Sequence, residues 1–538
     1  MKKTTLIIVF ILSTTVACND DLFDLTPQDS LSGDLIFADE GLIEAFVNRT
    51  YGDGIRHGFR RDANLDALSD NAYYTHNNGT WNFLEGGVTP DNGEGTTGNL
   101  WASSFSTLRR INLYFDNIET APVTDAVKEQ FNAEMKFIRA WVYYDLLRWY
   151  GGVPIVDEVF AVNDDPSLLV RSTYEEVVSR IVNDLDDVVG TLEMRDNSGR
   201  ASGIAALALK SRVLLYAASS LNNPSNDQAK WTAARDAAKA VIDVIGDNTL
   251  HGDYSEVFLG TTTETIWERN FAGGGNNIPL QNHRVNTTNN PNGHAGWGGN
   301  TPLQSLVDAY DMANGLPITD PASGYNDQDP YVNRDPRFYA TINYNGAMWK
   351  GRQIETFNGG LDTSEGPVQP WNGGRTGYYM KKWLNEAEPV NESVPSTFPW
   401  IFFRNAEVYL NYAETFLALG DEVNARIWMN KTRTRAGMPD ITETGSALVD
   451  RYRNERRVEL AYENHRFFDI LRWQIAEDVL SGPSMGITIV NNNGALSYDY
   501  SREVLATRSF DASKHYRFPI PRSEINKSSG LTQNPGYN

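Results

Sequence analysis

The sequence predicts a mainly α-helical protein in which long irregular loops separate the helices. Apolar residues recur every three or four positions in several segments, most clearly between Phe131 and Trp149, and this spacing places them on one helix face. Three stretches rich in glycine and asparagine, about 70–100, 270–300 and 345–375, lack this periodicity and are predicted to be loops. The chain has 538 residues and is 41% hydrophobic and 22% charged, so it is globular and long enough for a large core.

The N-terminus has the pattern of an export signal. Two lysines precede an apolar run at 6–12, and small residues follow up to Cys18. Seven apolar residues are too few to cross a bilayer. The pattern resembles a lipoprotein signal peptide over 1–17, although Thr15 stands where leucine is usual. It predicts cleavage before Cys18, lipidation of Cys18 and a polar tether over 18–38. The alternative for a lone cysteine is a small buried hydrophobic residue, and one cysteine allows no intrachain disulfide.

The predicted helix around Phe131–Trp149 is the centre of the fold. Thr124 or Asp125 opens it, Gly151 and Gly152 end it, and the next proline prevents an immediate restart. Alanine, tryptophan and tyrosine residues widen its apolar surface well beyond one stripe. A helix of this kind is packed on more than one side.

Other helices are predicted before and after this one by the same periodicity. They span 39–51, 99–118, 174–192, 201–221, 231–245, 404–420, 424–437 and 445–473. Helix pairs of this length resemble degenerate tetratricopeptide repeats, which stack into a curved scaffold. An ordinary helical bundle is the alternative.

Four segments carry a resemblance to a known family. They are FIRAWVYYDLLRWYGGVPIV (137–156), RNAEVYLNYAETFLALGD (404–421), RNERRVELAYENHRFFDILRW (453–473) and the ending HYRFPIPRSEIN…LTQNPGY (515–537). In this order they resemble the SusD/RagB family of Bacteroidetes outer-membrane glycan-binding lipoproteins. The resemblance implies a single SusD-like unit over 39–538, with an N-terminal part at 39–265 that holds the helical repeats and a C-terminal part at 266–538.

The resemblance also implies a location and a partner. The acidic residues directly after Cys18 resemble the surface-export signal of Bacteroidetes, which implies a lipid-anchored protein on the outer face of the outer membrane. Members of the family bind glycans without cleaving them. They act as a lid on a SusC-like TonB-dependent transporter, to which the helical face of this chain would bind. The binding loops of the family vary, so candidate residues must come from loop context.

The first predicted loop contains Trp81 among turn-forming residues, together with Tyr74, Asn78 and Asp70. An exposed indole can stack on a sugar ring, while amide and carboxylate groups bind its hydroxyls. The alternative is that Trp81 closes the edge of the core.

The second and third loops contain Trp297, flanked by glycines, and Trp371. His283 is a further candidate, although it could equally be a solvated loop histidine. Two histidines without a third ligand do not make a zinc site, so we expect no metal and no cofactor. Loops this long without periodicity usually have a function. We expect the three loops to converge on one shallow glycan-binding face, on the side away from the helical scaffold.

Charge and motifs restrict the function further. The net charge is −22, and becomes −24 once the first 17 residues are removed. A field of this sign repels nucleic acid and anionic polysaccharide, and mildly favours a neutral ligand. Neither the H-E-x-x-H motif of a metalloprotease nor the G-x-x-x-x-G-K-[ST] motif of a phosphate-binding loop is present. The interleaved arginine and glutamate residues of 451–463 are interpreted as a salt-bridged helix face with i,i+4 pairs, although a catalytic role is conceivable.

These observations favour a surface lipoprotein, not an enzyme, that captures a neutral polysaccharide or oligosaccharide and delivers it to a transporter. One alternative is an endo-acting glycoside hydrolase, because two catalytic carboxylates need to meet only in space. The other is a structural adaptor that holds surface lipoproteins together and binds no sugar.

Overall fold

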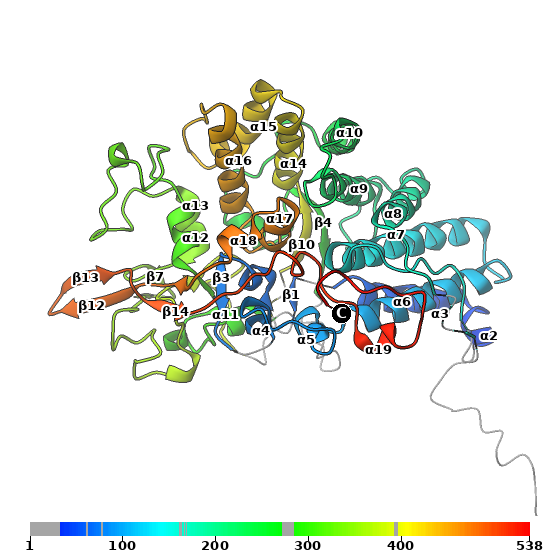
Figure 1. The fold of residues 1–538 in the computed structure, drawn as a ribbon, viewed down its shortest axis with the longest axis horizontal. Helices are drawn as coiled ribbons and strands as arrows, with labels where there is room; N and C mark the ends of the chain where they lie inside the picture. Colours follow the sequence, from blue (N-terminus) through cyan, green and yellow to red (C-terminus); the bar gives the residue numbers. More distant parts are fainter. Residues whose placement is uncertain are drawn as a thin grey trace, which may run out of the picture.

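A computed structural model of the chain describes residues 33–56, 58–60, 63–76, 79–160, 164–165, 167, 169–271, 284–391, 396 and 398–537 (Figure 1). Its helices are α2 (Gly33–Ile36), α3 (Glu40–Gly54), α4 (Thr80–Leu84), α5 (Gly93–Thr97), α6 (Leu100–Ile118), α7 (Asp125–Tyr150), α8 (Tyr174–Val188), α9 (Gly203–Ala218), α10 (Gln228–Ile245), α11 (Val285–Asn289), α12 (Gln304–Ala309), α13 (Pro336–Thr341), α14 (Asn405–Ala418), α15 (Glu422–Arg435), α16 (Gly445–Glu459), α17 (Arg466–Arg472), α18 (Ala476–Val479) and α19 (Arg522–Ile525).

The strands are short and form two-stranded antiparallel pairs. They are β1 (Phe59–Arg60), β2 (Ala63–Asn64), β3 (Ala72–Tyr74), β4 (Thr265–Arg269), β5 (Asn300–Pro302), β6 (Ile342–Asn343), β7 (Met348–Trp349), β8 (Arg352–Gln353), β9 (Tyr379–Met380), β10 (Trp400–Arg404), β11 (Ser484–Met485), β12 (Thr488–Asn492), β13 (Ala495–Asp499) and β14 (Glu503–Leu505). The pairs are β1–β2, β3–β5, β4–β10, β6–β9, β7–β8, β11–β14 and β12–β13.

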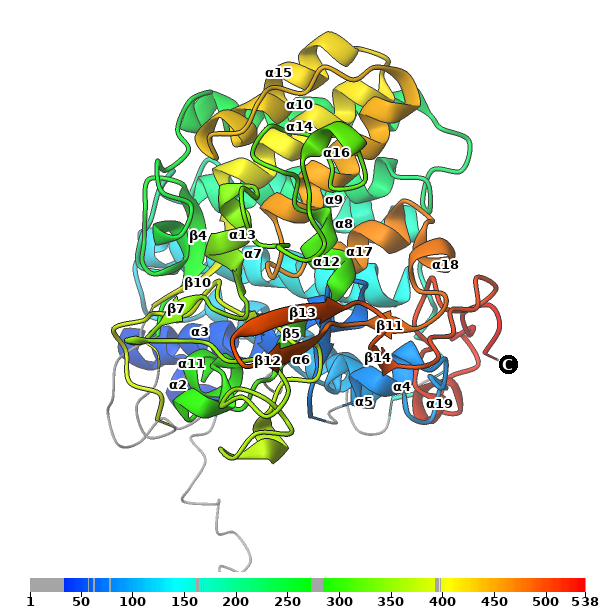
Figure 2. The same ribbon diagram turned by 90° about the vertical axis from the view of Figure 1, so that its left-hand side faces the viewer.

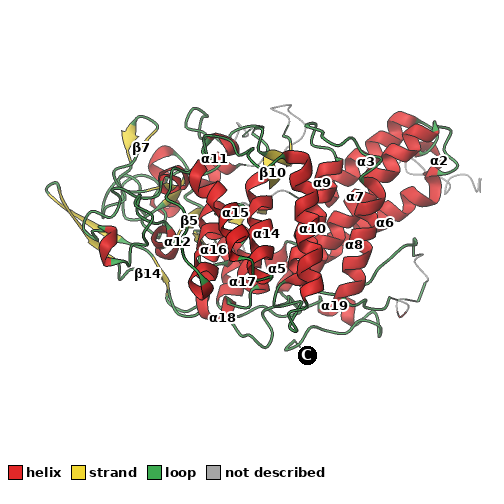
Figure 3. Cartoon of the chain, turned by 90° about the horizontal axis from the view of Figure 1, so that it is seen from above, coloured by secondary structure: helices red, strands yellow, loops and turns green. Residues whose placement is uncertain are grey.

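The helices stack one against the next along the chain. Helices α6 to α10 pack in sequence, and α14, α15 and α16 continue the stack from α10 (Figures 1 and 3). Contacts between successive helices are the mark of a helical repeat scaffold. The mainly α-helical prediction is therefore confirmed. No helix in the described part of the chain is both long and apolar enough to cross a membrane.

The central helix α7 begins and ends where the sequence predicts. Thr124 caps its start by accepting a hydrogen bond from the amide of Val127, and the amide of Gly151 (φ 78°) donates to Leu147 at its end. Gly152 has to be a glycine, because a Cβ there would lie 2.1 Å from the carbonyl oxygen of Ser172. The two glycines thus turn the chain tightly against the start of α8.

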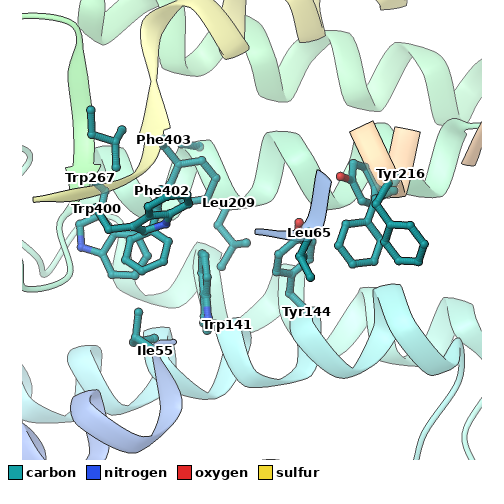
Figure 4. Packing of buried hydrophobic residues seen from close by; sticks show 14 of the residues in the cluster. Ile55, Leu65, Trp141, Tyr144, Leu209, Tyr216, Trp267, Trp400, Phe402 and Phe403 are labelled. Carbon is teal, nitrogen blue, oxygen red and sulfur yellow. The ribbon is translucent and has the colours of Figure 1, made fainter. Parts of the chain in front are cut away.

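The core of the protein surrounds α7. The ring of Trp141 lies edge-on to Phe402 of β10 and to Trp267 of β4, with ring centroids 4.9 and 5.1 Å apart (Figure 4). Trp267 and Phe402 stack on each other at 4.5 Å. Helix α7 therefore packs against the β4–β10 pair as well as against α6 and α8. This two-sided burial agrees with the wide apolar surface seen in the sequence.

The predicted helix 445–473 is wrong in one respect, because two helices, α16 and α17, occupy this range. Tyr462 and Asn464 between them have left-handed backbone angles, φ 62° and 65°. The amide of Tyr462 donates to the carboxylate of Asp66 (2.6 Å), and the side chain of Asn464 accepts from the amide of Leu65 (2.8 Å). The break is thus stabilised by contacts with a distant segment, which helical periodicity does not reveal.

The expected i,i+4 salt bridges on α16 are also wrong. Glu459 is fully buried and instead pairs with Arg404 (2.8 Å), Arg337 (2.9 Å) and Arg435, which come from other elements. The reason is that α16 packs against α12, α14 and α15, so these positions face protein and not water. Buried charges need partners of opposite sign, and arginine supplies several donors at once.

Candidate functional site

The first two predicted loops meet at the β3–β5 ladder, in which Tyr74 lies opposite Asn300. Just beyond the ladder, Nε2 of His76 lies 2.7 Å from the carbonyl oxygen of Trp297. This contact places the backbone of Trp297 beside the loop that leads to Trp81.

The third loop packs on the second through a close backbone approach. The carbonyl oxygen of Asn372 lies 2.5 Å from the position that a Cβ on Gly298 would take, so residue 298 has to be a glycine. The side-chain amide of Asn292 also donates to the carbonyl of Thr363 (3.1 Å). The described parts of the three loops therefore converge, as the sequence analysis predicted, whereas residues 272–283 lie outside them. Figures 1 and 2 show α4 and α11 of this face on the side opposite α15.

Trp81 is half-buried at the start of α4 and is held rigidly. Its Nε1–H donates to the carbonyl of Tyr74 (2.9 Å), and its ring stacks on Tyr73 at 5.7 Å with an interplanar angle of 19°. The guanidinium of Arg375, from the third loop, lies 5.8 Å from the indole centroid. Tyr73 thus occupies one face of the indole, and Arg375 brings hydrogen-bond donors beside it.

Trp297 is also half-buried, and its backbone is fixed by a hydrogen bond from its amide to the carbonyl of Thr287 (2.8 Å). The ring of His76 meets the indole edge-on at 6.5 Å, and the guanidinium of Arg284 lies 5.9 Å from it. Trp297 therefore combines an aromatic surface with an adjacent positive donor, as Trp81 does.

Trp371 is the most accessible of the three tryptophans, with 73% of its surface exposed. It lies in a short 3₁₀ turn, Pro370–Asn372, in which the amide of Asn372 donates to the carbonyl of Gln369 (2.9 Å). The side chain of Asn372 also donates to that of Gln369 (3.1 Å). The backbone is thus ordered while the indole stands in solvent, and a large apolar group so exposed is typical of a binding surface.

Two other candidates, Tyr74 and Asp70, lie inside the protein, 3% and 5% exposed. The carboxylate of Asp70 forms ion pairs with Arg466 (2.8 Å) and Arg457 (3.0 Å). Burial alone would raise the pKa of Asp70, but these two arginines hold it well below its usual range. Both side chains are part of the structure beneath the face, and we leave them out of the proposed site. The physical reason is that the β3–β5 ladder and the segment before it are covered on both sides.

Three further candidates, Asn78, His283 and Cys18, lie outside the described residues.

Three residues beside the candidate tryptophans were not predicted from the sequence, namely Tyr73, His76 and Arg375. Their roles depend on the register of β3 against β5 and on the path of the third loop, so no local pattern identifies them. Burial raises the pKa of Tyr73, and Arg375 partly opposes this shift. The tyrosine therefore stays neutral and acts here as a ring and a hydroxyl group.

The arrangement suits a hydroxyl-rich ligand. Ordered indoles offer flat apolar surfaces, and Arg284 and Arg375 offer hydrogen-bond donors. Within the described ranges, no three histidine, cysteine, aspartate or glutamate side chains come together as a metal site would require.

Comparison with known proteins gives two family matches that together span most of the chain. Residues 263–537 match the family described as "SusD family", and residues 24–215 match the family described as "Starch-binding associating with outer membrane". Among curated proteins, a "SusD-like protein" of Bacteroides ovatus is 24% identical over 502 residues, covering 88% of this chain and 83% of the relative. The "Starch-binding protein SusD" of Bacteroides thetaiotaomicron is 24% identical over 489 residues, covering 80% of this chain and 76% of the relative.

The fold is also found among solved structures. A SusD-like protein from Bacteroides fragilis superposes with a TM-score of 0.77 and 28% identity, covering 94% of this chain and 98% of that one.

Proposed function

The chain belongs to the SusD family, and from that premise we propose that it captures a neutral polysaccharide or oligosaccharide at the outer membrane without cleaving it. The observation that carries the proposal is the three-loop face, on which the loop of the exposed Trp371 packs against Gly298, next to the half-buried Trp297, and places Arg375 beside Trp81. The name of one relative, a starch-binding protein, and the description of the N-terminal family match point to the same ligand class.

Trp371 would be the main stacking platform, since its ring is free in solvent. Trp297 and Trp81 would extend the surface, with Arg284 and Arg375 binding sugar hydroxyls. Asn78 and His283 remain proposed contributors from loop context alone. A net charge of −22 favours a neutral glycan, because an anionic polymer would be repelled.

The carboxylates of α16 and the turn after it are poor candidates for acid catalysis. A general acid needs a pKa raised towards neutrality. Burial would raise the pKa of Glu455, Glu459 and Glu463, but neighbouring arginines hold all three below their ordinary value. They stay ionised in the interior, so none of the three fits the role of a general acid.

We further propose that Cys18 carries a lipid that anchors the protein at the cell surface, and that the glycan passes to a SusC-like TonB-dependent transporter. The stack of helices α6–α10 and α14–α16 would provide the docking surface, since the three-loop face lies away from α15 (Figure 2). The family description of association with the outer membrane supports this location. Co-purification of a large barrel protein with the lipidated chain tests it.

The test of glycan capture is calorimetric titration with a panel of neutral and acidic polysaccharides, with reducing ends assayed in the same tubes. We expect one neutral class to bind and no reducing ends to appear. Release of reducing ends would favour the hydrolase, and an absence of binding across the panel would favour the structural adaptor.

The placement of the site is tested separately by Trp371→Ala. Loss of an aromatic anchor typically costs more than about 1 kcal/mol, so we expect affinity to fall roughly fivefold or more. The control is Trp428→Ala, which removes a half-buried tryptophan from α15 on the helical scaffold. If the wild type and Trp371→Ala bind the glycan with equal affinity, Trp371 is not part of the binding site.

A further inference from the structure

Helix α7 carries three side chains that are not part of the proposed glycan site. Trp141, Tyr144 and Arg148 are three and four residues apart, so they share one face of the helix. All three line a small cavity of about 40 Å³ that is also bounded by Arg212 of α9 and by residues of β10. Figure 4 shows Trp141 and Tyr144 rising side by side from α7 in this region. The volume is that of about three water molecules, or of one small ion with its nearest water.

The cavity has buried hydrogen-bond donors without acceptors. Nε1 of Trp141 and the hydroxyl of Tyr144 have no partner, and the two side chains are only 3% and 1% exposed. The indole N–H can only donate, and the phenol hydroxyl can donate as well. Buried donors are normally paired, so two unpaired ones on residues that line one cavity require an explanation.

One arginine of the described cavity wall has no carboxylate in direct contact, although Asp145 and other carboxylates act on it from farther away. Arg148 pairs with Asp145, and Arg212 pairs with Glu407. A third arginine, Arg56, lines the cavity and donates to the carbonyl of Gly98 (3.2 Å). No carboxylate of the described residues lies within ion-pair distance of it.

Glu463 and His465 of the described wall do not supply a negative charge for Arg56. Glu463 forms ion pairs with Lys382 (2.7 Å) and Arg404 (2.6 Å), so its charge is already matched. Burial, followed by Arg212 and other nearby arginines, lowers the pKa of His465 well below its ordinary value. His465 is therefore neutral, and the arginines around it make the cavity electrically positive.

We propose that this cavity binds one monovalent anion of halide size, which accepts hydrogen bonds from Trp141, Tyr144 and Arg56. A space of about 40 Å³ suits a small anion, and chloride is the abundant candidate. The ion would link α7 to β10 and to the turn at Glu463–His465, so it would stabilise the contact between sequence-distant parts of the fold. This site is separate from the three-loop face and does not depend on the proposed glycan function.

The direct test is crystallography of the protein in sodium bromide, with data collected at the bromine absorption edge. We expect one anomalous peak in the cavity, within hydrogen-bonding distance of Nε1 of Trp141 and the hydroxyl of Tyr144. A cavity filled by water alone, with bromide found only at the surface, would overturn the proposal.

A solution test uses the thermal unfolding midpoint at constant ionic strength, with chloride replaced stepwise by gluconate, which is too large to enter. We expect the midpoint of the wild type to rise with chloride concentration, and to follow its logarithm once chloride exceeds the dissociation constant, as for any ligand that binds only the folded state. Tyr144→Phe removes one donor and should weaken chloride binding roughly tenfold or more.

The matched control is Tyr114→Phe, which removes another buried hydroxyl without a partner from α6, away from the cavity. Its chloride response should equal that of the wild type. Arg56→Gln is a second variant at a partly exposed position, in case Tyr144→Phe folds poorly. If Tyr144→Phe or Arg56→Gln keeps the full chloride response of the wild type, the proposal is wrong.

Discussion

Replacing Glu459 by glutamine tests whether the buried ion pairs stabilise the C-terminal part of the fold. Glu459 is 0% exposed and accepts hydrogen bonds from Arg404 (2.8 Å), Arg337 (2.9 Å) and Arg435. Glutamine has nearly the same shape but no charge, so Glu459→Gln leaves these arginines with one carboxylate fewer. The amide nitrogen of the glutamine is also a hydrogen-bond donor, and it would face the N–H donors of the arginines.

The expected loss of unfolding free energy is large for a single substitution. Breaking a buried ion pair by removing one partner costs about 3–5 kcal/mol, because the remaining charge stays buried. The control is Asp450→Asn on the same helix, where Asp450 lies 3.9 Å from Arg453 and is 78% exposed. An exposed pair of this kind contributes at most about 1 kcal/mol. Both variants are compared with the wild type by urea unfolding at pH 7.

The pH dependence provides a second, independent readout. Burial alone would raise the pKa of Glu459, but Arg435, Arg404 and Arg337 hold it well below its ordinary value of 4.5. A carboxylate with a lowered folded-state pKa stabilises the protein above its unfolded-state pKa, and this stabilisation fades as the pH falls below that value. The difference between the wild type and Glu459→Gln should therefore be constant near neutrality and narrow below about pH 4.5. A difference under about 1 kcal/mol at pH 7, or one that does not change with pH, would refute the reasoning.

Two further predictions concern local structure. Gly152→Ala should destabilise the protein by about 1–3 kcal/mol or more, because the added Cβ would lie 2.1 Å from the carbonyl oxygen of Ser172. The control is Gly190→Ala, whose Cβ would meet no atom within 4 Å and which should be neutral or slightly stabilising. Equal thermal midpoints for the two variants would contradict the prediction. Ser202→Ala should lower the free energy of unfolding in urea by about 1 kcal/mol. The hydroxyl of Ser202 caps α9 by accepting a hydrogen bond from the amide of Ala205 (3.3 Å). An unchanged urea midpoint would argue against this cap.

Helix positions were largely predictable because helices are local structures. The bounds of α7 follow from Thr124 and Gly151, which act on the backbone within one turn of the helix. The same local rules misjudged the range 445–473. The left-handed residues Tyr462 and Asn464 are held there by residues 64–66, and no pattern in the neighbouring sequence records that contact.

The candidate site was predictable in part. Glycine and asparagine content marked the three loops, and the isolated tryptophans within them drew attention to Trp81, Trp297 and Trp371. Exposure could not be read from the sequence, however. Trp371 and Asp70 both lie among turn-forming residues, yet one is 73% exposed and the other 5% exposed. The difference arises because Arg466 and Arg457, far along the chain, enclose Asp70.

The sequence by itself thus determined the class of fold, the helix ends and the composition of the loops, because these depend on neighbours within a few residues. The tertiary structure decided which loops meet, which indole reaches solvent and which carboxylate pairs with which arginine. These properties depend on contacts between residues that are hundreds of positions apart, such as Asp70 with Arg466 and His76 with Trp297. Long-range contacts of this kind are determined by packing and by the need to pair buried charges. Neither factor produces a periodic pattern in the sequence.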